Sequence, residues 1–446
     1  MSKPVTLKRN LSISHVVTMG LAWMSPMIFF TSFGVLSEGS GGMMLAAYVL
    51  AFIAIVFTAA SYGQMAKAFP VSGSAYTYVT KSMNPFTGFL VGWAILLDYL
   101  FSCIVAVLMF GINLNAQFPS VPSFVWILAL TLVIMVVNII GIKSSANLNK
   151  VFVIMQVLFI AGFCGMIVYK AMENGLTAGF NPLPASHGVS FSTILAGASL
   201  VCFSFLGFDS VTTMAEETKE PKKTIPRAIM AIVLIAGVLY FVTAYLIQQM
   251  YPSFTFSNAD SAGFELMQTI GGSGLASIYT FVVIFAVLSQ GMSSMTTVSR
   301  LLFVMGRSSI LPAKTFGSIH PKFRTPVFNI VLVSIISLAA LFMSLDTAIK
   351  FVSFGALTAF LFVNIAVIFH YIIRGKQRAP KDLLVRLVCP LIGALFILYL
   401  VTLLDVDSLV LGFSWLILGS LYYAATRIKR KDSAVSVPIA DAEGVV

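Results

Sequence analysis

Long apolar stretches separated by short polar loops run through almost the whole chain. Each stretch has about 20 residues or more, the length that a helix needs to cross a hydrocarbon core of about 30 Å. They predict membrane-spanning helices, because lipid offers no hydrogen-bond partner to an exposed backbone group. The expected fold is an all-α membrane protein. Twelve spans are expected, with ends placed to within several residues, at about 13–37, 42–66, 86–113, 121–141, 148–170, 189–217, 227–251, 270–304, 325–344, 346–373, 386–404 and 408–427.

The composition excludes an ordinary soluble domain. Of the 446 residues, 59% are apolar and only 10% are charged, whereas an average soluble domain has about 25% charged residues. A soluble fold could not cover so much apolar surface with polar groups. No cleavable signal peptide is expected, because the first apolar stretch is too long and lacks a small-residue cleavage site. The polar segment 433–446 is expected to be a disordered tail.

Basic residues lie almost entirely in alternate loops. With the expected spans, 25 of the 27 lysines and arginines fall on one side of the membrane, and only Lys170 and Lys350 fall on the other. The positive-inside rule places the basic side, with both termini, in the cytoplasm, and it requires an even number of spans. The formal net charge of +11 is thereby assigned to membrane topology, so a nucleic-acid partner is excluded.

Two of the expected spans contain residues that interrupt a helix. The first span carries Pro26, which lacks an N–H and clashes with the preceding turn. The sixth span reads CFSFLGFDSVTTMAEE over 202–217, where Gly207 permits unwinding and Asp209 can satisfy freed backbone groups. Either one alone could be an ordinary kink. Because they lie five spans apart, they predict two five-helix repeats of inverted topology, each opening with a broken helix. The breaks are expected near residues 24–27 and 204–209.

Two carboxylates fall well inside the expected spans. Of the sixteen in the chain, these are Asp98 and Asp209. Burying a carboxylate at that depth costs about 2.5 kcal/mol or more, so such a group is kept for a partner, a substrate or a proton. Asp209 is interpreted as the group that meets a substrate amine or the coupling proton, and the alternative is a structural cap on the broken helix. Asp98 is the second candidate for proton coupling, although a fixed interhelical hydrogen bond fits it equally well.

The remaining candidates surround the two breaks. Aromatic rings there could hold an ammonium group over their faces, but most of the 38 phenylalanines must face lipid or the core. Glu217 and Lys222 are the candidates for a cytoplasmic gate, and a plain ion pair of Glu216 or Glu217 with Lys222, Lys223 or Arg227 is the alternative. The expected substrate-binding residues are Trp23, Ser25, Pro26, Met27, Tyr99, Ser204, Phe205, Gly207, Phe208 and Asp209.

Metal binding and enzyme chemistry have no sequence support. The four cysteines lie in apolar stretches without CxxC spacing, and they fit small buried hydrophobes. The four histidines (His15, His187, His320 and His370) are scattered towards span ends and loops. A membrane enzyme needs a nucleophile–base set or metal ligands at depth, and a channel needs charged rings or filter carbonyls. The sequence has neither, so it predicts a secondary transporter, acting as a monomer or weak homo-oligomer.

Three motifs carry a resemblance to a known family. They are FPVSGSAYTYVTKSMNP at 69–85, GFDSVTTMAEETKEPKKTIPRAI at 207–229 and SRLLFVMGRSSILPAKTFGSIHPKFRTP at 299–326. In this order and spacing, the chain resembles the amino acid–polyamine–organocation superfamily over roughly residues 8–430. The runs MGLAWMSPM, LLDYLF and VCFSFLGFDSVTT are most similar to bacterial putrescine importers.

The resemblance implies a fold and an activity. The implied fold is a single LeuT-type transporter domain over 1–430, with inverted repeats at about 13–170 and 189–373 and extra helices at about 386–427. The implied activity is proton-driven import of a small amine across the bacterial plasma membrane by alternating access, with no cofactor. Span five lacks the lysine that replaces a sodium ion in some members, so sodium coupling is an open alternative.

Two departures from the family leave the substrate open. Amino-acid-binding members carry a GSG-type run in the first break, whose amides hold the substrate carboxylate. Here the run is Ser25-Pro26-Met27, and Pro26 has no amide hydrogen, which fits a substrate without a carboxylate. The putrescine importers carry an acid a few positions further on, in a run like FDTFG. Here that run is FTSFG, at 30–34, and lacks the second anion that a diamine needs. An amino acid permease or exchanger is therefore the alternative to an amine importer.

Overall fold

The computed structural model describes residues 11–140, 145–173, 188–251, 255–323 and 325–431, and throughout these ranges the regular elements are helices. Within them, eleven helices are long and apolar enough to cross a membrane, and the stretch Val327–Phe342 is a shorter apolar helix. The chain is therefore a multi-pass membrane protein. The shorter helix lies where the span 325–344 was expected. The expected tail 433–446 and His187 lie outside the described residues.

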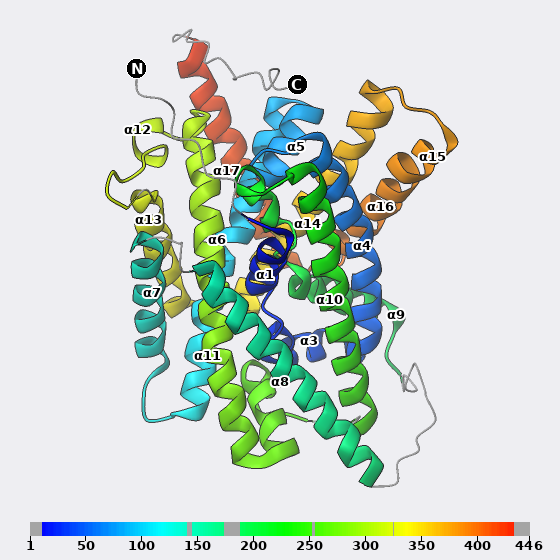
Figure 1. The fold of residues 1–446 in the computed structure, drawn as a ribbon, viewed down its shortest axis with the longest axis vertical. Coiled ribbons are helices and arrows are strands. Elements are labelled where there is room, and N and C mark those ends of the chain that lie inside the picture. Colours follow the sequence, from blue (N-terminus) through cyan, green and yellow to red (C-terminus); the bar gives the residue numbers. More distant parts are fainter. Residues whose placement is uncertain (1–10, 141–144, 174–187, 252–254, 324, 432–446) are drawn as a thin grey trace.

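The long helices overlap the expected spans, and Figure 1 shows how they are arranged. They are, in chain order, α1 (Ile13–Met24), α2 (Ile28–Thr31), α3 (Phe33–Gly39), α4 (Met44–Ala68), α5 (Ser74–Ser82), α6 (Pro85–Gln117), α7 (Ser123–Ile140), α8 (Ser145–Glu173), α9 (Phe191–Val201), α10 (Pro221–Met250), α11 (Ala262–Arg307), α12 (Ala313–Phe316), α13 (Val327–Ser337), α14 (Leu345–Val367), α15 (Pro380–Leu383), α16 (Cys389–Thr402) and α17 (Val406–Lys431). Short 3-10 or π segments are η2 (Cys202–Phe205), η3 (Ser210–Glu217), η4 (Ala259–Ser261), η5 (Leu338–Phe342), η6 (Ile368–Arg374) and η7 (Leu384–Val388).

Both expected breaks are present, so this part of the prediction is confirmed. In the first span α1 ends at Met24, Ser25 takes a left-handed φ of 49°, and the helix resumes only at Ile28. In the sixth span η2 ends at Phe205, Gly207 takes a φ of 115°, and helical turns resume at Ser210. A proline and a glycine thus interrupt the two helices where the sequence placed them.

One further interruption was not expected. Helix α11 begins at Ala262, ahead of the expected span that starts at about 270, but Gly272 leaves the helical conformation with a φ of 66° and a ψ of −164°. The Lys170 ammonium, at the end of α8, donates to the carbonyl of Ile270 beside this turn. The first turns of α11 therefore form a separate short helix that precedes the membrane span.

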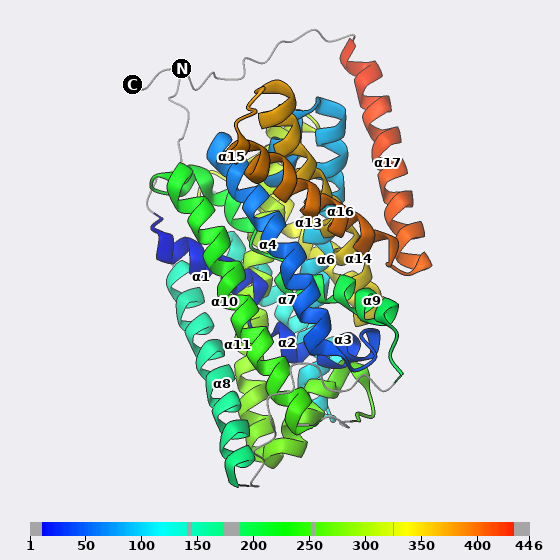
Figure 2. The ribbon, with the colours of Figure 1, turned by 90° about the vertical axis from the view of Figure 1, so that its right-hand side faces the viewer.

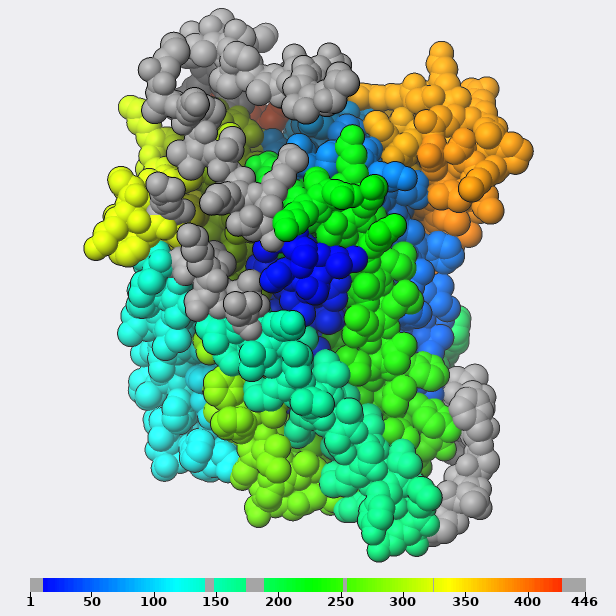
Figure 3. All heavy atoms as spheres, viewed as in Figure 1, coloured from blue at the N-terminus to red at the C-terminus, as the bar shows by residue number. Residues whose placement is uncertain are grey.

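The first span enters the bundle from one face, and its residues from 19 to 36 are all buried. Figures 1 and 3 show α1 at the centre of that face, flanked by α8 and α10.

The helix α17 lies at the edge of the bundle opposite α8, as Figure 2 shows. It packs on α6 through a stacked pair, Trp93 and Trp415, with ring centroids 4.8 Å apart. Each indole N–H donates to the backbone carbonyl of the other tryptophan, at 2.9 and 2.7 Å.

Candidate substrate site

One of the two deep acids, Asp209, lies in the break of the sixth span. Its side chain is only 1% exposed. The hydroxyl of Tyr99, on α6, donates to Oδ2 at 2.6 Å, whereas Oδ1 has no hydrogen-bond partner among the described residues. A buried polar atom without a partner is costly, and it marks a place where a ligand or a proton is missing. One carboxylate oxygen of Asp209 is thus hydrogen bonded, and the other has no hydrogen-bond partner among the described residues.

The second deep carboxylate, Asp98, lies one residue before Tyr99 on α6. It is also buried, and it accepts a hydrogen bond from the Ser102 hydroxyl one turn further along, at 3.2 Å. Asp98 and Asp209 are close enough to interact electrostatically. The structure therefore brings together the two acids that the sequence placed at membrane depth, although they are far apart in the chain.

The two breaks touch through Trp23 and Gly207. A β-carbon on Gly207 would lie 2.2 Å from Cδ1 of Trp23 and 2.9 Å from the backbone nitrogen of Met24, so only glycine fits here. The Trp23 ring meets Tyr99 edge to face, with centroids 5.2 Å apart. Trp23, Gly207, Tyr99 and Asp209 thus form one contiguous group, as expected for residues that face a common substrate.

A buried glutamine that sequence reasoning missed spans the first break. Gln156, on α8, accepts at Oε1 a hydrogen bond from the Ser25 hydroxyl at 3.0 Å and another from the Met27 amide at 3.3 Å. Its Nε2 has no partner among the described residues. Pro26 lies buried between the two bonded residues. The sequence offers a signal, because Gln156 is a polar side chain within an apolar run, but a search of this span for a lysine alone overlooks it.

Ser204 and Phe205 support the second break within an aromatic cluster. The Tyr240 hydroxyl donates to the carbonyl of Ser204 at 3.0 Å, and the Tyr48 hydroxyl is hydrogen bonded to the Ser204 hydroxyl at the same distance. Phe205 packs edge to face on Tyr240, with centroids 5.4 Å apart. Phe208 lies in a different cluster, 5.5 Å from the ring of Tyr62. The two phenylalanines therefore have different neighbours, and only Phe208 adjoins the residues around Asp209.

Two tyrosines beside Asp209 were also missed. Tyr62 on α4 and Tyr78 on α5 are fully buried, and their ring centroids are 6.2 Å apart. Both interact electrostatically with Asp209. Tyr78 falls inside the motif 69–85, but a shared motif alone does not assign it to the site. The tyrosines could not be singled out, because nothing in their local sequence distinguishes them from the other tyrosines of the chain.

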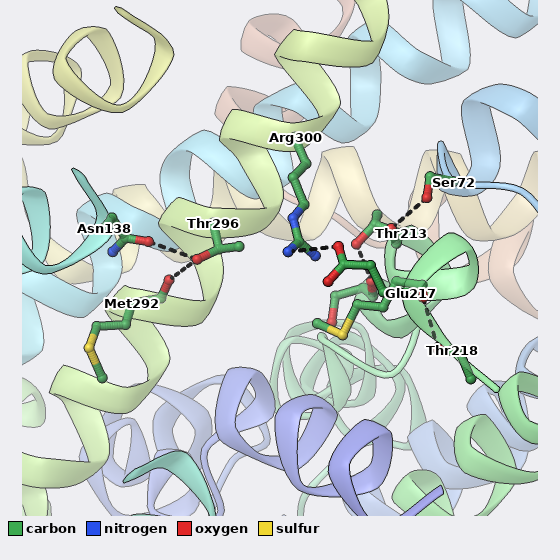
Figure 4. Close-up of polar contacts among 10 residues, drawn as sticks. Ser72, Asn138, Thr213, Glu217, Thr218, Met292, Thr296 and Arg300 are labelled. Atoms are coloured by element: carbon green, nitrogen blue, oxygen red, sulfur yellow. Dashed lines mark hydrogen bonds and ion pairs between the residues drawn. The ribbon is translucent and has the colours of Figure 1, made fainter. Parts of the chain in front are cut away.

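At the end of the sixth span, Glu217 pairs with a different residue from the one expected. Its carboxylate forms an ion pair with Arg300 of α11, with N···O at 3.0 Å, and both side chains are about a quarter exposed. Figure 4 shows Arg300 reaching from α11 towards Glu217. Lys222 instead lies exposed on α10, so Glu217 forms its ion pair with Arg300 and not with Lys222, and the gate role of Lys222 stays a prediction. The reason is topological: the following helix carries the lysines away, while α11 passes directly beside η3.

Backbone contacts close the same end. Leu11 and Thr218 form an isolated parallel bridge, in which the Leu11 amide donates to the Glu217 carbonyl and the Lys219 amide donates to the Leu11 carbonyl, both at 3.0 Å. The Ser72 hydroxyl donates to the carbonyl of Thr213 at 2.7 Å, also drawn in Figure 4. Segments from three parts of the chain are therefore joined at the end of η3.

Close packing joins α3 to η4 at the far end of the first span. A β-carbon on Gly34 would lie 2.1 Å from the carbonyl oxygen of Ala259, so the backbones touch there. Within the described ranges, no cluster of three or more His, Cys, Asp or Glu side chains could hold a metal ion.

A helical bundle with two broken helices and paired buried acids is the arrangement of a membrane transporter. The chain belongs to the amino acid permease family, which matches residues 15–423, and it is therefore a transporter rather than an enzyme. It is 40% identical over 425 residues to the low-affinity putrescine importer PlaP of Escherichia coli (strain K12), covering 94% of each chain. It is 28% identical over 454 residues to the branched-chain amino acid permease BcaP of Bacillus subtilis (strain 168), covering 94% and 93%. A methylthioribose transporter of the same organism is 28% identical over 447 residues, covering 95% and 94%.

Proposed function

We propose that the chain imports a small organic amine such as putrescine across the bacterial inner membrane, coupled to protons, by alternating access. The observation that carries this proposal is the unpartnered Oδ1 of Asp209, buried in a helix break beside Trp23 and Tyr99. An ammonium group supplies both the charge and the hydrogen-bond donors that this oxygen lacks. The similarity to a putrescine importer supports the same substrate class.

The proposed architecture is a twelve-span domain over residues 1–430. The inverted repeats would be about 13–170 and 189–373, followed by the two extra helices at about 386–427. The two observed breaks, five spans apart, support this division. In such a fold the substrate sits near the midplane between the breaks, and Asp209 and Trp23 lie beside the two breaks. Ser25, Pro26, Met27, Ser204 and Phe205 would then shape the walls of the site, and Phe208 would adjoin the amine.

An amino acid permease is the second candidate, and one observation favours it. The Nε2 donor of Gln156 is buried without a partner beside the first break, where it could meet a substrate carboxylate. Three observations oppose it. Pro26 has no amide hydrogen, and the amide of Met27 is already bonded to Gln156. A carboxylate would also have to lie near two buried acids, so the amine importer is the better-supported function.

Competition uptake separates these functions. In proteoliposomes containing the whole protein, putrescine and spermidine should inhibit uptake of labelled putrescine, whereas the common amino acids should not. Dissipating the proton gradient with a protonophore should abolish accumulation, because the coupling proton supplies the driving force. Inhibition by amino acids but not by amines would favour the permease. Uptake that requires sodium and ignores the protonophore would refute proton coupling.

The orientation is proposed from the distribution of charge. The loop between α11 and α12 should be cytoplasmic, with both termini, because 25 of the 27 basic residues lie on that side of the expected spans. Ser309 is exposed in this loop. The variant Ser309→Cys should react with a membrane-impermeant maleimide only after the cells are permeabilised. The unaltered chain, with its four native cysteines, is the control. Labelling of Ser309→Cys in intact cells would reverse the orientation.

A further inference from the structure

Two buried hydroxyls next to Asp209 have no role in the proposed function so far. The phenolic oxygens of Tyr62 and Tyr78 are fully buried, and neither makes a hydrogen bond of normal geometry with a described residue. Tyr62 interacts weakly with the hydroxyl of Ser74, and Tyr78 interacts weakly with that of Thr212. A phenylalanine would fill either position without this penalty, because its ring has no polar atom to bury. The presence of tyrosine therefore calls for an explanation other than packing.

The unpartnered oxygens converge from separate elements. Tyr62 is on α4, Tyr78 is on α5, and Oδ1 of Asp209 lies in the sixth span. Tyr62 and Tyr78 meet edge to face at 6.2 Å, and Tyr62 interacts electrostatically with both Asp98 and Asp209. The cluster thus contains two carboxylates and two phenolic hydroxyls, all buried.

The chemistry of this cluster selects its ligand. None of the ion pairs formed by the described residues includes Asp98 or Asp209. A ligand carboxylate would add a third negative charge, and a neutral ligand would leave both acids without a counter-charge. An ammonium group has three N–H donors and a positive charge, so it can bind a carboxylate and a phenolic oxygen together. Two carboxylates in one cluster can accept two such groups.

We propose that Tyr62 and Tyr78, together with Asp98, bind the second ammonium group of a diamine whose first ammonium group is held by Asp209 and Tyr99. This inference rests on the proposed function and names the residues that determine its specificity. It makes the short helix α5 part of the binding site. It also supplies the anion that the first span lacks in its run FTSFG at 30–34, because Asp98 offers that charge from α6.

The test compares three ligands of similar length. Inhibition of labelled-putrescine counterflow is measured in proteoliposomes for 1,4-diaminobutane, for n-butylamine and for 4-aminobutan-1-ol, which replaces one ammonium group by a neutral hydroxyl. In the unaltered protein the diamine should inhibit at least about tenfold more strongly than either monoamine, as expected for one more hydrogen-bonded charge. Equal inhibition by the diamine and the amino alcohol would overturn the proposal, because no second charge would then be recognised.

Variants of the two tyrosines test whether they cause the preference for the diamine. In Tyr62→Phe and in Tyr78→Phe, the inhibition constant of the diamine should rise about tenfold while that of n-butylamine stays unchanged. Tyr279→Phe is the matched control, since Tyr279 is equally buried but its hydroxyl donates to Asn113 at 3.0 Å, outside the cluster. The control should keep the full preference for the diamine.

The contrary outcomes are distinct. The assignment would be overturned if both tyrosine variants kept the inhibition constant of the diamine unchanged. It would also be overturned if they weakened inhibition by the diamine and by n-butylamine equally. The tyrosines would then have only a packing role. An unaltered protein that no amine inhibits would refute the proposed function itself. Inhibition by amines with a diamine preference that ignores both tyrosines would refute only the present inference.

Discussion

Asp209→Asn should abolish proton-coupled amine uptake while the protein still inserts and folds. The substitution keeps the shape of the side chain and its hydrogen bond from Tyr99, but it removes the charge. Removing one partner of a buried charged pair costs about 2–5 kcal/mol, which corresponds to a loss of roughly thirtyfold or more in affinity. Uptake of labelled putrescine into proteoliposomes measures the effect. Asp407→Asn is the control, because Asp407 is exposed at the start of α17.

Exchange at zero gradient then separates the two roles of this acid. If Asp209 only carries the coupling proton, exchange of internal for external putrescine should survive in Asp209→Asn. If it binds the amine, exchange should fail together with uptake. Uptake close to that of the unaltered protein, at an unchanged pH dependence, would show that the carboxylate only caps the broken helix.

Charge reversal at Glu217 or at Arg300 should reduce uptake by about tenfold, and the double exchange should restore most of it. The pair joins the end of η3 to α11 and is only about a quarter exposed, so a like-charge contact there costs more than at the open surface. We propose that this pair, with the bridge of Leu11 to Thr218, keeps the cytoplasmic end closed. Glu217→Arg should therefore favour the state open at that end.

The native thiols report that opening. Cys103 and Cys202 are buried in the closed state, so their alkylation should become faster in Glu217→Arg and return to its original rate in the double exchange. Glu220→Gln is the matched control. Lys223 holds the pKa of Glu220 below its ordinary value, but both side chains are 70% exposed, and such a surface pair contributes little. Uptake that is unaffected by either single reversal would exclude Glu217 and Arg300 from the gate.

Features with a local cause could be predicted from the sequence. The spans follow from runs of apolar residues, and the breaks follow from Pro26, which lacks an N–H, and from Gly207, which can adopt a positive φ. The two buried acids are conspicuous in the sequence, because each is a carboxylate inside an apolar run. The extra helix before Gly272 was missed for the converse reason, since its residues are too polar to read as part of a span.

Features that depend on partners distant in the chain could not be predicted. Gln156 contacts Ser25 although 131 positions separate them in the sequence, and Arg300 contacts Glu217 although helix α10 lies between them in the sequence. Arg300 is one of the many basic residues that set the topology, and nothing in its neighbourhood distinguishes it from them. Tyr62 and Tyr78 have no conspicuous local signal, because an aromatic residue in an apolar helix is ordinary. Only the packing of α4 and α5 against the second break gives these residues a common position.

The two breaks differ in whether they contain a group that can titrate, because the side chain that bridges the first break is the glutamine Gln156. An amide neither gains nor loses a proton over the physiological pH range, so the bonds of Gln156 to Ser25 and Met27 keep the same form at any pH at which the cell lives. The second break contains a group that can change its charge. A rearrangement driven by protons would therefore begin at the buried acids, Asp209 in the second break and Asp98 on α6, and would reach the first break mechanically. The contact that would transmit it is the indole of Trp23 resting directly on the backbone of Gly207.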